Sequence, residues 1–138
     1  MKIRREQLNA FQEVADDAFV GRVISYVQEK HGTLTIELPS GKFLISDLSD
    51  ETLSRLARNG IIHAREYGMT WESTLTSFVV IMFMTAPNFH QHPIINRILR
   101  DESVEPNMRI DRLLENVTGA NWQAAKDMGD PQAWGLTE

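Results

Sequence analysis

The stretch Phe78-Val79-Val80-Ile81-Met82-Phe83-Met84 determines the fold expected for this chain of 138 residues. Seven consecutive apolar residues leave no polar face, and a helix of this kind normally lies at the centre of a bundle. Thr70 is the predicted N-cap of a helix over about residues 71–85. The apolar run is far shorter than the roughly 20 residues that a membrane-spanning helix needs. We therefore expect a central core helix and no membrane insertion.

The segment before this centre predicts a second helix, from the N-cap Ser49 to about Tyr67. Its apolar residues follow three- and four-residue spacing: Leu53, Leu56, Ala57, Gly60, Ile61 and Ala64. A glycine inside a helix costs about 1 kcal/mol of propensity relative to alanine. Gly60 therefore indicates a close crossing with another helix.

Two prolines after the centre each begin a short helix at its first position. Pro93 opens the fourth helix and Pro106 the fifth, which Gly119 is expected to end. Together with a first helix near the N-terminus, these elements predict a mainly α fold. It is a compact bundle of about five helices around the helix over residues 71–85.

The periodicity changes to two between the first helix and Ser49. Thr33 to Leu38 alternates, the turn residues Pro39-Ser40-Gly41-Lys42 follow, and Phe43-Leu44-Ile45 resumes the apolar pattern. This predicts a short β-hairpin over about residues 33–46. A two-stranded hairpin is marginal alone in water. It either packs on the chain's own helices, which we favour, or accepts a partner strand at its open edge.

The first helix, expected over about residues 4–30, carries two apolar stripes. The first consists of Leu8, Phe11, Ala15 and Ala18, and the second of Val20, Val23, Ile24 and Val27. At 100° per residue the stripes lie more than a third of a turn apart. Either both form one wide core face, or one meets a partner protein or a second copy. The candidate partner-binding residues are the second stripe with Leu34 and Ile36 beside it.

The chain is the length of one ordinary domain. We expect a single helical domain over residues 1–128 and a polar, loosely held C-terminal tail over residues 129–138. Trp134 lies on this tail. It either folds over the domain or anchors a partner, because tryptophan is enriched at binding hot spots. Trp134 therefore joins the candidate partner-binding residues.

The amino-acid composition argues against several classes of function. The formal net charge of −5, from 14 basic and 19 acidic residues, disfavours nucleic-acid binding, which needs a basic surface. The absence of cysteine excludes disulfides, thiolate metal sites and thiol catalysis, and suits a reducing compartment. No apolar run follows the N-terminal residues, so no secretory signal is expected and we predict a cytoplasmic protein.

The sequence contains no convincing catalytic or metal-ligating constellation. His90-Gln91-His92 is the only histidine spacing suited to a metal, but zinc needs three or four ligands and no acidic residue lies in the same loop. Two surface histidines are the expected outcome. No Gly-x-Ser-x-Gly elbow or phosphate-binding glycine loop is present. We therefore predict a non-enzymatic protein with no cofactor and no metal.

Several short motifs, weak singly, gain weight from their order. They are Ile3-Arg4-Arg5-Glu6-Gln7 with Phe11, then Arg58-Asn59-Gly60-Ile61-Ile62-His63-Ala64-Arg65-Glu66-Tyr67-Gly68, Phe83, Pro87-Asn88-Phe89, Pro93 and Arg109-Ile110-Asp111-Arg112-Leu113. This order resembles a group of small bacterial proteins encoded in type VI secretion and polymorphic-toxin gene clusters. The chain departs from that group at its predicted hairpin, where the group has a plain loop, and around His90, where the group is acidic.

The resemblance implies a secretion-associated accessory protein. The leading hypothesis is an adaptor or chaperone that binds a secreted effector or a component of the secretion apparatus. The alternative is an immunity protein that neutralises a toxin through the acidic surface. A small enzyme or metal-binding protein is the least favoured hypothesis. A homodimer stays open, because a second copy would cover an unused stripe on the first helix most simply.

Overall fold

A computed structural model of the chain describes the backbone of residues 5–136 and the side chains of residues 16–136. The helices are α1 (Arg5–His31), α2 (Asp50–Glu66), α3 (Glu72–Met84), α4 (Pro93–Leu99), α5 (Arg109–Asn116) and α6 (Gly119–Asp127). A hairpin of β1 (Thr35–Leu38) and β2 (Gly41–Leu44) follows α1. Short 3-10 turns complete the order: η1 (Ile45–Asp47), η2 (Phe89–Gln91), η3 (Pro106–Met108) and η4 (Pro131–Trp134). The mainly α fold with a hairpin after the first helix is confirmed.

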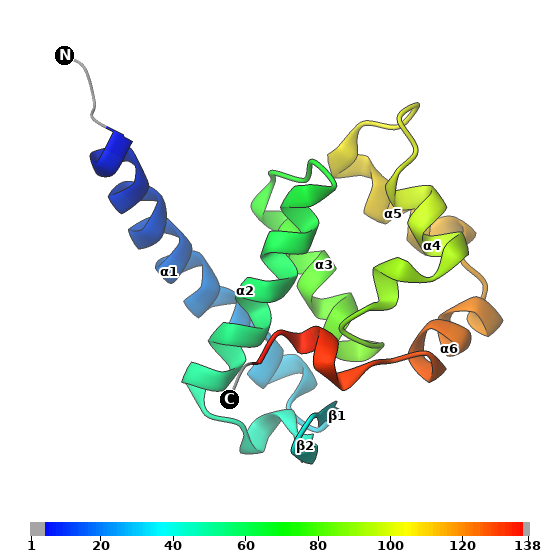
Figure 1. Cartoon of the computed structure of the whole chain (residues 1–138), viewed down its shortest axis with the longest axis horizontal. Coiled ribbons are helices and arrows are strands. Elements are labelled where there is room, and N and C mark those ends of the chain that lie inside the picture. The colour runs from blue at the N-terminus through cyan, green and yellow to red at the C-terminus, as the bar shows by residue number, and fades with distance from the viewer. Residues whose placement is uncertain (1–4, 137–138) are drawn as a thin grey trace.

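The α2–α3 pair forms the centre of the molecule (Figure 1). Phe78, Val79 and Met82 of α3 are fully buried, as expected of a central helix. Gly60 permits the close approach of α2, because a Cβ there would lie 2.7 Å from Cε of Met82. The predicted close crossing at Gly60 is therefore confirmed, and α3 is its partner.

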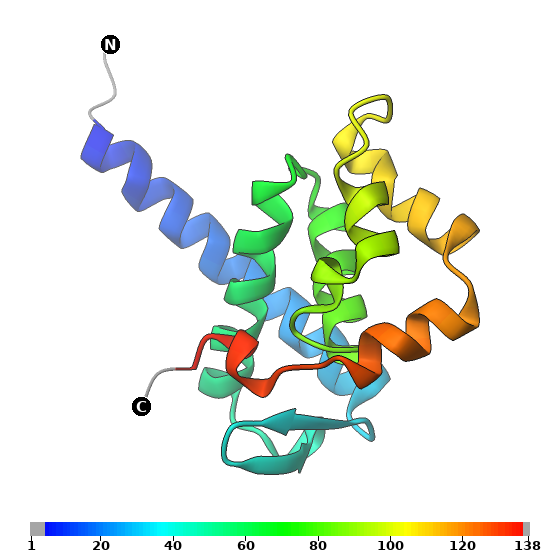
Figure 2. The same cartoon turned by 45° about the vertical axis from the view of Figure 1, so that its right-hand side comes forward.

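The C-terminal half of α1 packs on α2, α3 and η1, whereas the ribbon of its N-terminal half extends away from the other helices (Figures 1 and 2). Arg65 forms an ion pair with Asp16 at 2.9 Å, and Arg58 forms one with Asp17. These pairs join α2 to α1 where α1 leaves the core. The side chains of Leu8, Phe11 and Ala15, from the first predicted stripe, lie outside the described residues.

The helix ends follow local sequence with three corrections, the first being that Pro106 begins η3, whereas α5 begins at Arg109. The Ser49 hydroxyl accepts from the Thr52 backbone N–H at 3.1 Å, as predicted. Thr70 is not the N-cap of α3: Trp71 holds that position, and its N–H donates to the buried Asn107 side chain at 3.0 Å. Gly119 does not end α5 but begins α6.

The C-terminal segment is also corrected by the structure. Instead of a loose tail, the residues after α6 form η4 and run above the hairpin toward α2 (Figure 2). Asn88 fixes the start of this segment, since its side-chain oxygen accepts from the Asp130 N–H at 2.9 Å. Asn59 of α2 fixes the end, since its amide donates to the Ala133 carbonyl at 2.9 Å. Residues up to 136 therefore belong to the folded domain.

Candidate functional site

The second stripe of α1 lies in the hydrophobic core. Five of the candidate partner-binding residues are between 0 and 7% exposed: Val20, Val23, Ile24, Val27 and Ile36. Leu34 is partly buried against the same core. The prediction of a partner-binding surface on these residues is therefore corrected, because they are buried in the core and α2, α3 and η1 pack against α1.

Trp134 is buried as well, at 2% exposure. Its ring centroid lies 5.4 Å from that of Phe83 on α3. Its indole N–H donates to the Glu37 carbonyl on β1 at 2.9 Å. Trp134 thus links η4 to both the core and the hairpin. It does not stand free as a partner anchor, and the alternative in which it folds over the domain is the one observed.

The outer edge of β1 keeps free backbone groups. Ile36 pairs with Phe43, and Leu34 accepts from the Ile45 N–H at 2.9 Å, so the alternating antiparallel pattern directs the backbone groups of Thr35 and Glu37 away from β2. Trp134 occupies the Glu37 carbonyl. Among the described residues, the Thr35 N–H, the Thr35 carbonyl and the Glu37 N–H have no hydrogen-bond partner.

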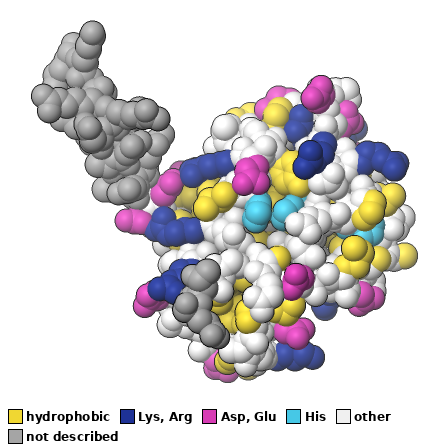
Figure 3. All heavy atoms as spheres, in the orientation of Figure 1, with side chains coloured by type: hydrophobic (Ala, Val, Ile, Leu, Met, Phe, Trp, Pro, Cys, Tyr) yellow, Lys and Arg dark blue, Asp and Glu magenta, His cyan; other side chains and the backbone are white. Residues whose placement is uncertain are grey.

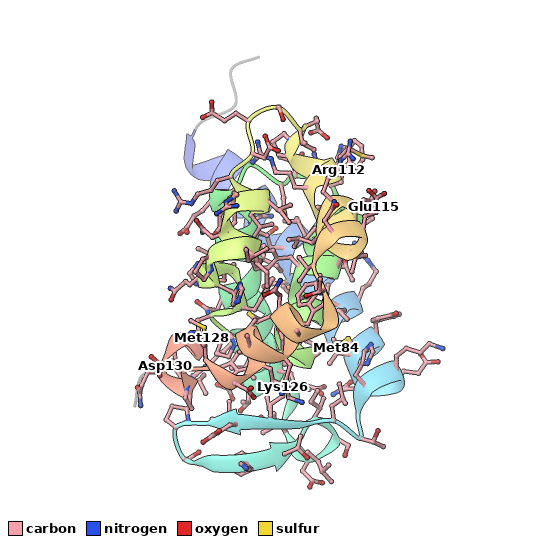
Figure 4. The ribbon with its side chains drawn as sticks, turned by 90° about the vertical axis from the view of Figure 1, so that its right-hand side faces the viewer. Met84, Arg112, Glu115, Lys126, Met128 and Asp130 are labelled. Carbon is pink, nitrogen blue, oxygen red and sulfur yellow. The ribbon has the colours of Figure 1, made fainter. Side chains whose placement is uncertain are left out.

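A cavity of about 310 Å³, here called the hairpin hollow, lies beside this edge. Its lining comes from the hairpin, the end of α3, the end of α6 and η4: Thr35, Ile36, Glu37, Lys42, Phe83, Met84, Thr85, Ala86, Pro87, Lys126, Asp127, Gly129, Pro131 and Trp134. Phe83, Ala86 and Trp134 are buried, whereas Met84 is 49% exposed. Figure 4 shows Lys126 between α6 and the hairpin. The hollow therefore combines apolar residues, two lysines (Lys42 and Lys126), two acidic residues (Glu37 and Asp127) and an unpaired strand edge.

A second, polar cavity of about 660 Å³ lies where α2 meets η2 and α4. His63 and His90 have ring centroids 4.6 Å apart there, and Figure 3 shows adjoining histidine side chains at this face. The Tyr67 hydroxyl lies 3.0 Å from Nδ1 of His90 and accepts from the Asn96 amide at 3.1 Å. Because Asn96 donates to the hydroxyl oxygen, the hydroxyl proton is available to Nδ1 of His90.

The pKa values of His90 and Tyr67 are shifted away from neutral pH in this polar cavity. Burial, together with a smaller effect of the neighbouring His63, lowers the pKa of His90 to about 4. Burial also raises the pKa of the Tyr67 hydroxyl. An effective general base has a pKa near the working pH. His90 and Tyr67 therefore stay neutral and serve as a hydrogen-bonded network that joins α2, η2 and α4.

The prediction of two surface histidines is wrong. His90 is 5% exposed and His92 is 7% exposed. His92 is the N-cap of α4, and its Nδ1 accepts from the Ile94 N–H at 3.3 Å. In residues 16–136, no three histidine or carboxylate side chains converge in a way that would hold a metal ion.

Arg109 is a buried charge that sequence reasoning missed. At 8% exposure, its guanidinium donates to the carbonyls of Leu99 at 2.9 Å, Tyr67 at 3.0 Å and Val104 at 3.0 Å. Leu99 and Tyr67 stand at the C-terminal ends of α4 and α2, where a positive charge complements the helix dipole. The motif that begins at Arg109 therefore has a structural role: its first residue ties two helix ends to α5.

Comparison of the chain with protein-family models, curated proteins and solved structures finds no match in any of the three. None of the helices in the described part of the chain has both the length and the apolar character needed to cross a bilayer. The fold and the two cavities thus define a mainly α domain with a buttressed hairpin. Its unpaired strand edge beside the hairpin hollow is the candidate functional site.

Proposed function

We propose that this chain is a protein-binding accessory protein without catalytic activity. The observation that carries the proposal is the free outer edge of β1 beside the hairpin hollow. Exposed strand edges are usually blunted or covered, because their unpaired groups bind other chains. Here the edge stands open at Thr35, next to a hollow in which Met84 is 49% exposed. Such a combination suits recognition of a protein segment.

The more specific role that we propose rests on the resemblance of the sequence motifs to the secretion-associated group. The chain would act in the cytoplasm as an adaptor or chaperone for a secreted effector of a type VI secretion system. The polar cavity at His90 supports the non-enzymatic part of this proposal, because the shifted pKa values of His90 and Tyr67 keep both groups neutral near pH 7. An immunity protein would share the binding function and differ in protecting cells from its partner.

Reconstitution with the product of a neighbouring effector gene tests the proposal. The purified full chain and that product should elute together in size-exclusion chromatography, with the mass of a complex by light scattering. Met84→Asp, in the hairpin hollow, should weaken the complex. Ile62→Asp is the matched control, because Ile62 is 55% exposed on α2 and does not line the hollow. Separate elution of the wild-type chain and all neighbouring products would contradict the proposal.

A toxicity assay separates the two roles. Cells that express the effector are expected to die whether or not the chain is present if the chain is an adaptor. Rescue by the wild-type chain, lost in Met84→Asp, would identify an immunity protein instead. Both outcomes retain protein binding as the function.

A further inference from the structure

We propose that the partner presents an extended segment that pairs with the outer edge of β1 as a third strand. This inference rests on the proposed protein-binding function and specifies how the partner is recognised. Strand addition obtains its affinity from backbone hydrogen bonds and its specificity from pockets for alternate side chains. The free backbone groups of Thr35 supply the hydrogen bonds, and the hairpin hollow supplies a pocket for a side chain.

The backbone pairing is set by the hairpin register. Thr35 and Leu44 face each other without exchanging hydrogen bonds, so the N–H and the carbonyl of Thr35 both point to the outer edge. One residue of an added strand can accept from that N–H and donate to that carbonyl. The Glu37 N–H offers a further donor, but Trp134 already occupies the Glu37 carbonyl. The added segment therefore pairs around Thr35 and ends beside Trp134.

The side-chain pattern of the segment follows from the faces of β1. Thr35 and Glu37 are exposed, while Ile36 and Leu38 face the core. The segment residue opposite Thr35 shares the exposed face, and its neighbour toward Trp134 enters the hairpin hollow on the face of Ile36. Met84 is 49% exposed at this hollow, with Phe83 and Trp134 buried behind it, so a side chain with an apolar stem fits beside Met84. The partner is thus expected to alternate, with an apolar residue next to the residue that pairs with Thr35.

A single extended segment fits this place better than a second copy of the chain. Neighbouring strands lie about 4.8 Å apart, so an added strand needs little space. The hairpin hollow is bounded by η4 and the end of α6, which lie above β1 (Figures 2 and 4). The β1 edge of a second copy carries its own η4 and α6. Symmetric pairing of two β1 edges would therefore force these elements into the same space.

A phage-displayed library of random 12-residue linear peptides provides the probe. Selected peptides should alternate as described and bind the full chain. Thr35→Pro removes the outward N–H without removing a bond to β2, and should weaken binding at least about tenfold. Leu44→Pro is the matched control: it removes the outward N–H of the opposite edge, and Leu44 already has a proline-compatible φ of −68°. The affinity of the Leu44→Pro variant for the selected peptides should stay within about twofold of that of the wild type.

Circular dichroism checks that both proline variants fold, and modified peptides make the test independent of folding. N-methylation of the peptide residue that pairs with Thr35 should abolish binding. N-methylation of the next peptide residue, whose N–H points away from β1, should leave binding unchanged. The inference is overturned by failure to select any peptide, by equal binding to Thr35→Pro, or by equal effects of the two methylations. It is also overturned if the Thr35 N–H becomes protected from hydrogen exchange only as the protein concentration rises, because that would indicate pairing with a second copy of the chain. A partner that binds wild type and Thr35→Pro equally leaves the proposed function standing and removes only strand addition.

Discussion

Replacement of Trp134 by alanine tests whether the C-terminal segment belongs to the folded domain. The indole is 2% exposed, packs on Phe83 and donates to the Glu37 carbonyl. Truncation of a buried tryptophan to alanine typically costs about 3–5 kcal/mol. The lost hydrogen bond adds only about 1 kcal/mol or less, because Glu37 is exposed and water can replace the indole. We therefore expect Trp134→Ala to lower the free energy of unfolding by about 4 kcal/mol.

This loss is a large fraction of the roughly 5–15 kcal/mol that stabilises an ordinary domain. For a chain of this length it corresponds to a decrease in Tm of about 10–15 °C. Trp134→Phe keeps an aromatic ring against Phe83 and loses the N–H donor, so its cost should be about 1–2 kcal/mol. The difference in unfolding free energy between the two variants therefore separates the contribution of ring packing from that of the hydrogen bond.

Urea unfolding followed by far-UV circular dichroism measures both variants without depending on tryptophan fluorescence. Trp71→Ala is the matched control, since Trp71 is 53% exposed and its truncation should cost no more than about 1 kcal/mol. A loss below about 1 kcal/mol for Trp134→Ala, or a loss equal to that of Trp71→Ala, would refute the packing described for η4.

Three further substitutions test the polar cavity, the buried guanidinium and the helix crossing. His90→Gln should flatten the pH dependence of stability between about pH 6.5 and pH 4. The unfolded chain takes up a proton on His90 near pH 6.5 and the folded chain near pH 4, so the wild type loses up to roughly 3 kcal/mol of stability as the pH falls through that window. Urea titrations at several pH values would measure this loss in the wild type and its absence in the variant. Arg109→Met should lower the free energy of unfolding by about 3 kcal/mol in the same assay, because one buried and two partly buried carbonyls lose their donor. A loss under about 1 kcal/mol would contradict that role. Gly60→Val should cost about 2 kcal/mol through overpacking against Met82 and Val79. Gly60→Ala should cost less than about 1 kcal/mol, because the end of Met82 can move and Cγ2 of Val79, 3.1 Å from the new Cβ, needs to shift only slightly. Equal costs would argue against a close crossing.

Features governed by neighbouring residues could be predicted from the sequence. The turn at Pro39-Ser40-Gly41 specified the hairpin, and Gly41 adopts a φ of 140°, which favours glycine. Ser49 and Pro93 marked the starts of α2 and α4 through local backbone chemistry. Each of these signals acts within a few residues and does not depend on distant packing.

Features governed by distant residues could not be predicted. Trp134 binds a carbonyl 97 positions earlier in the chain, so its local sequence contains no sign of burial. Periodicity identified the stripe that includes Val23 as apolar, but it could not tell whether the chain itself or a partner covers that stripe. Arg109 looks like any surface arginine until the ends of α2 and α4 converge on it. The candidate site could not be predicted for the same reason, because the hairpin hollow is formed by four separate parts of the chain.

Hydrogen exchange of the Thr35 amide, measured by NMR, tests most directly whether β1 offers an open edge. In the free protein the Thr35 N–H should exchange within about tenfold of an unstructured amide, as should that of Leu44 on the opposite edge. The Ile36 N–H, which pairs with β2, should exchange at least about tenfold more slowly than that of Thr35. Addition of a selected peptide should slow Thr35 and leave Leu44 unchanged. Strong protection of Thr35 in the free monomer would contradict the account, because the edge proposed for the partner would already be occupied.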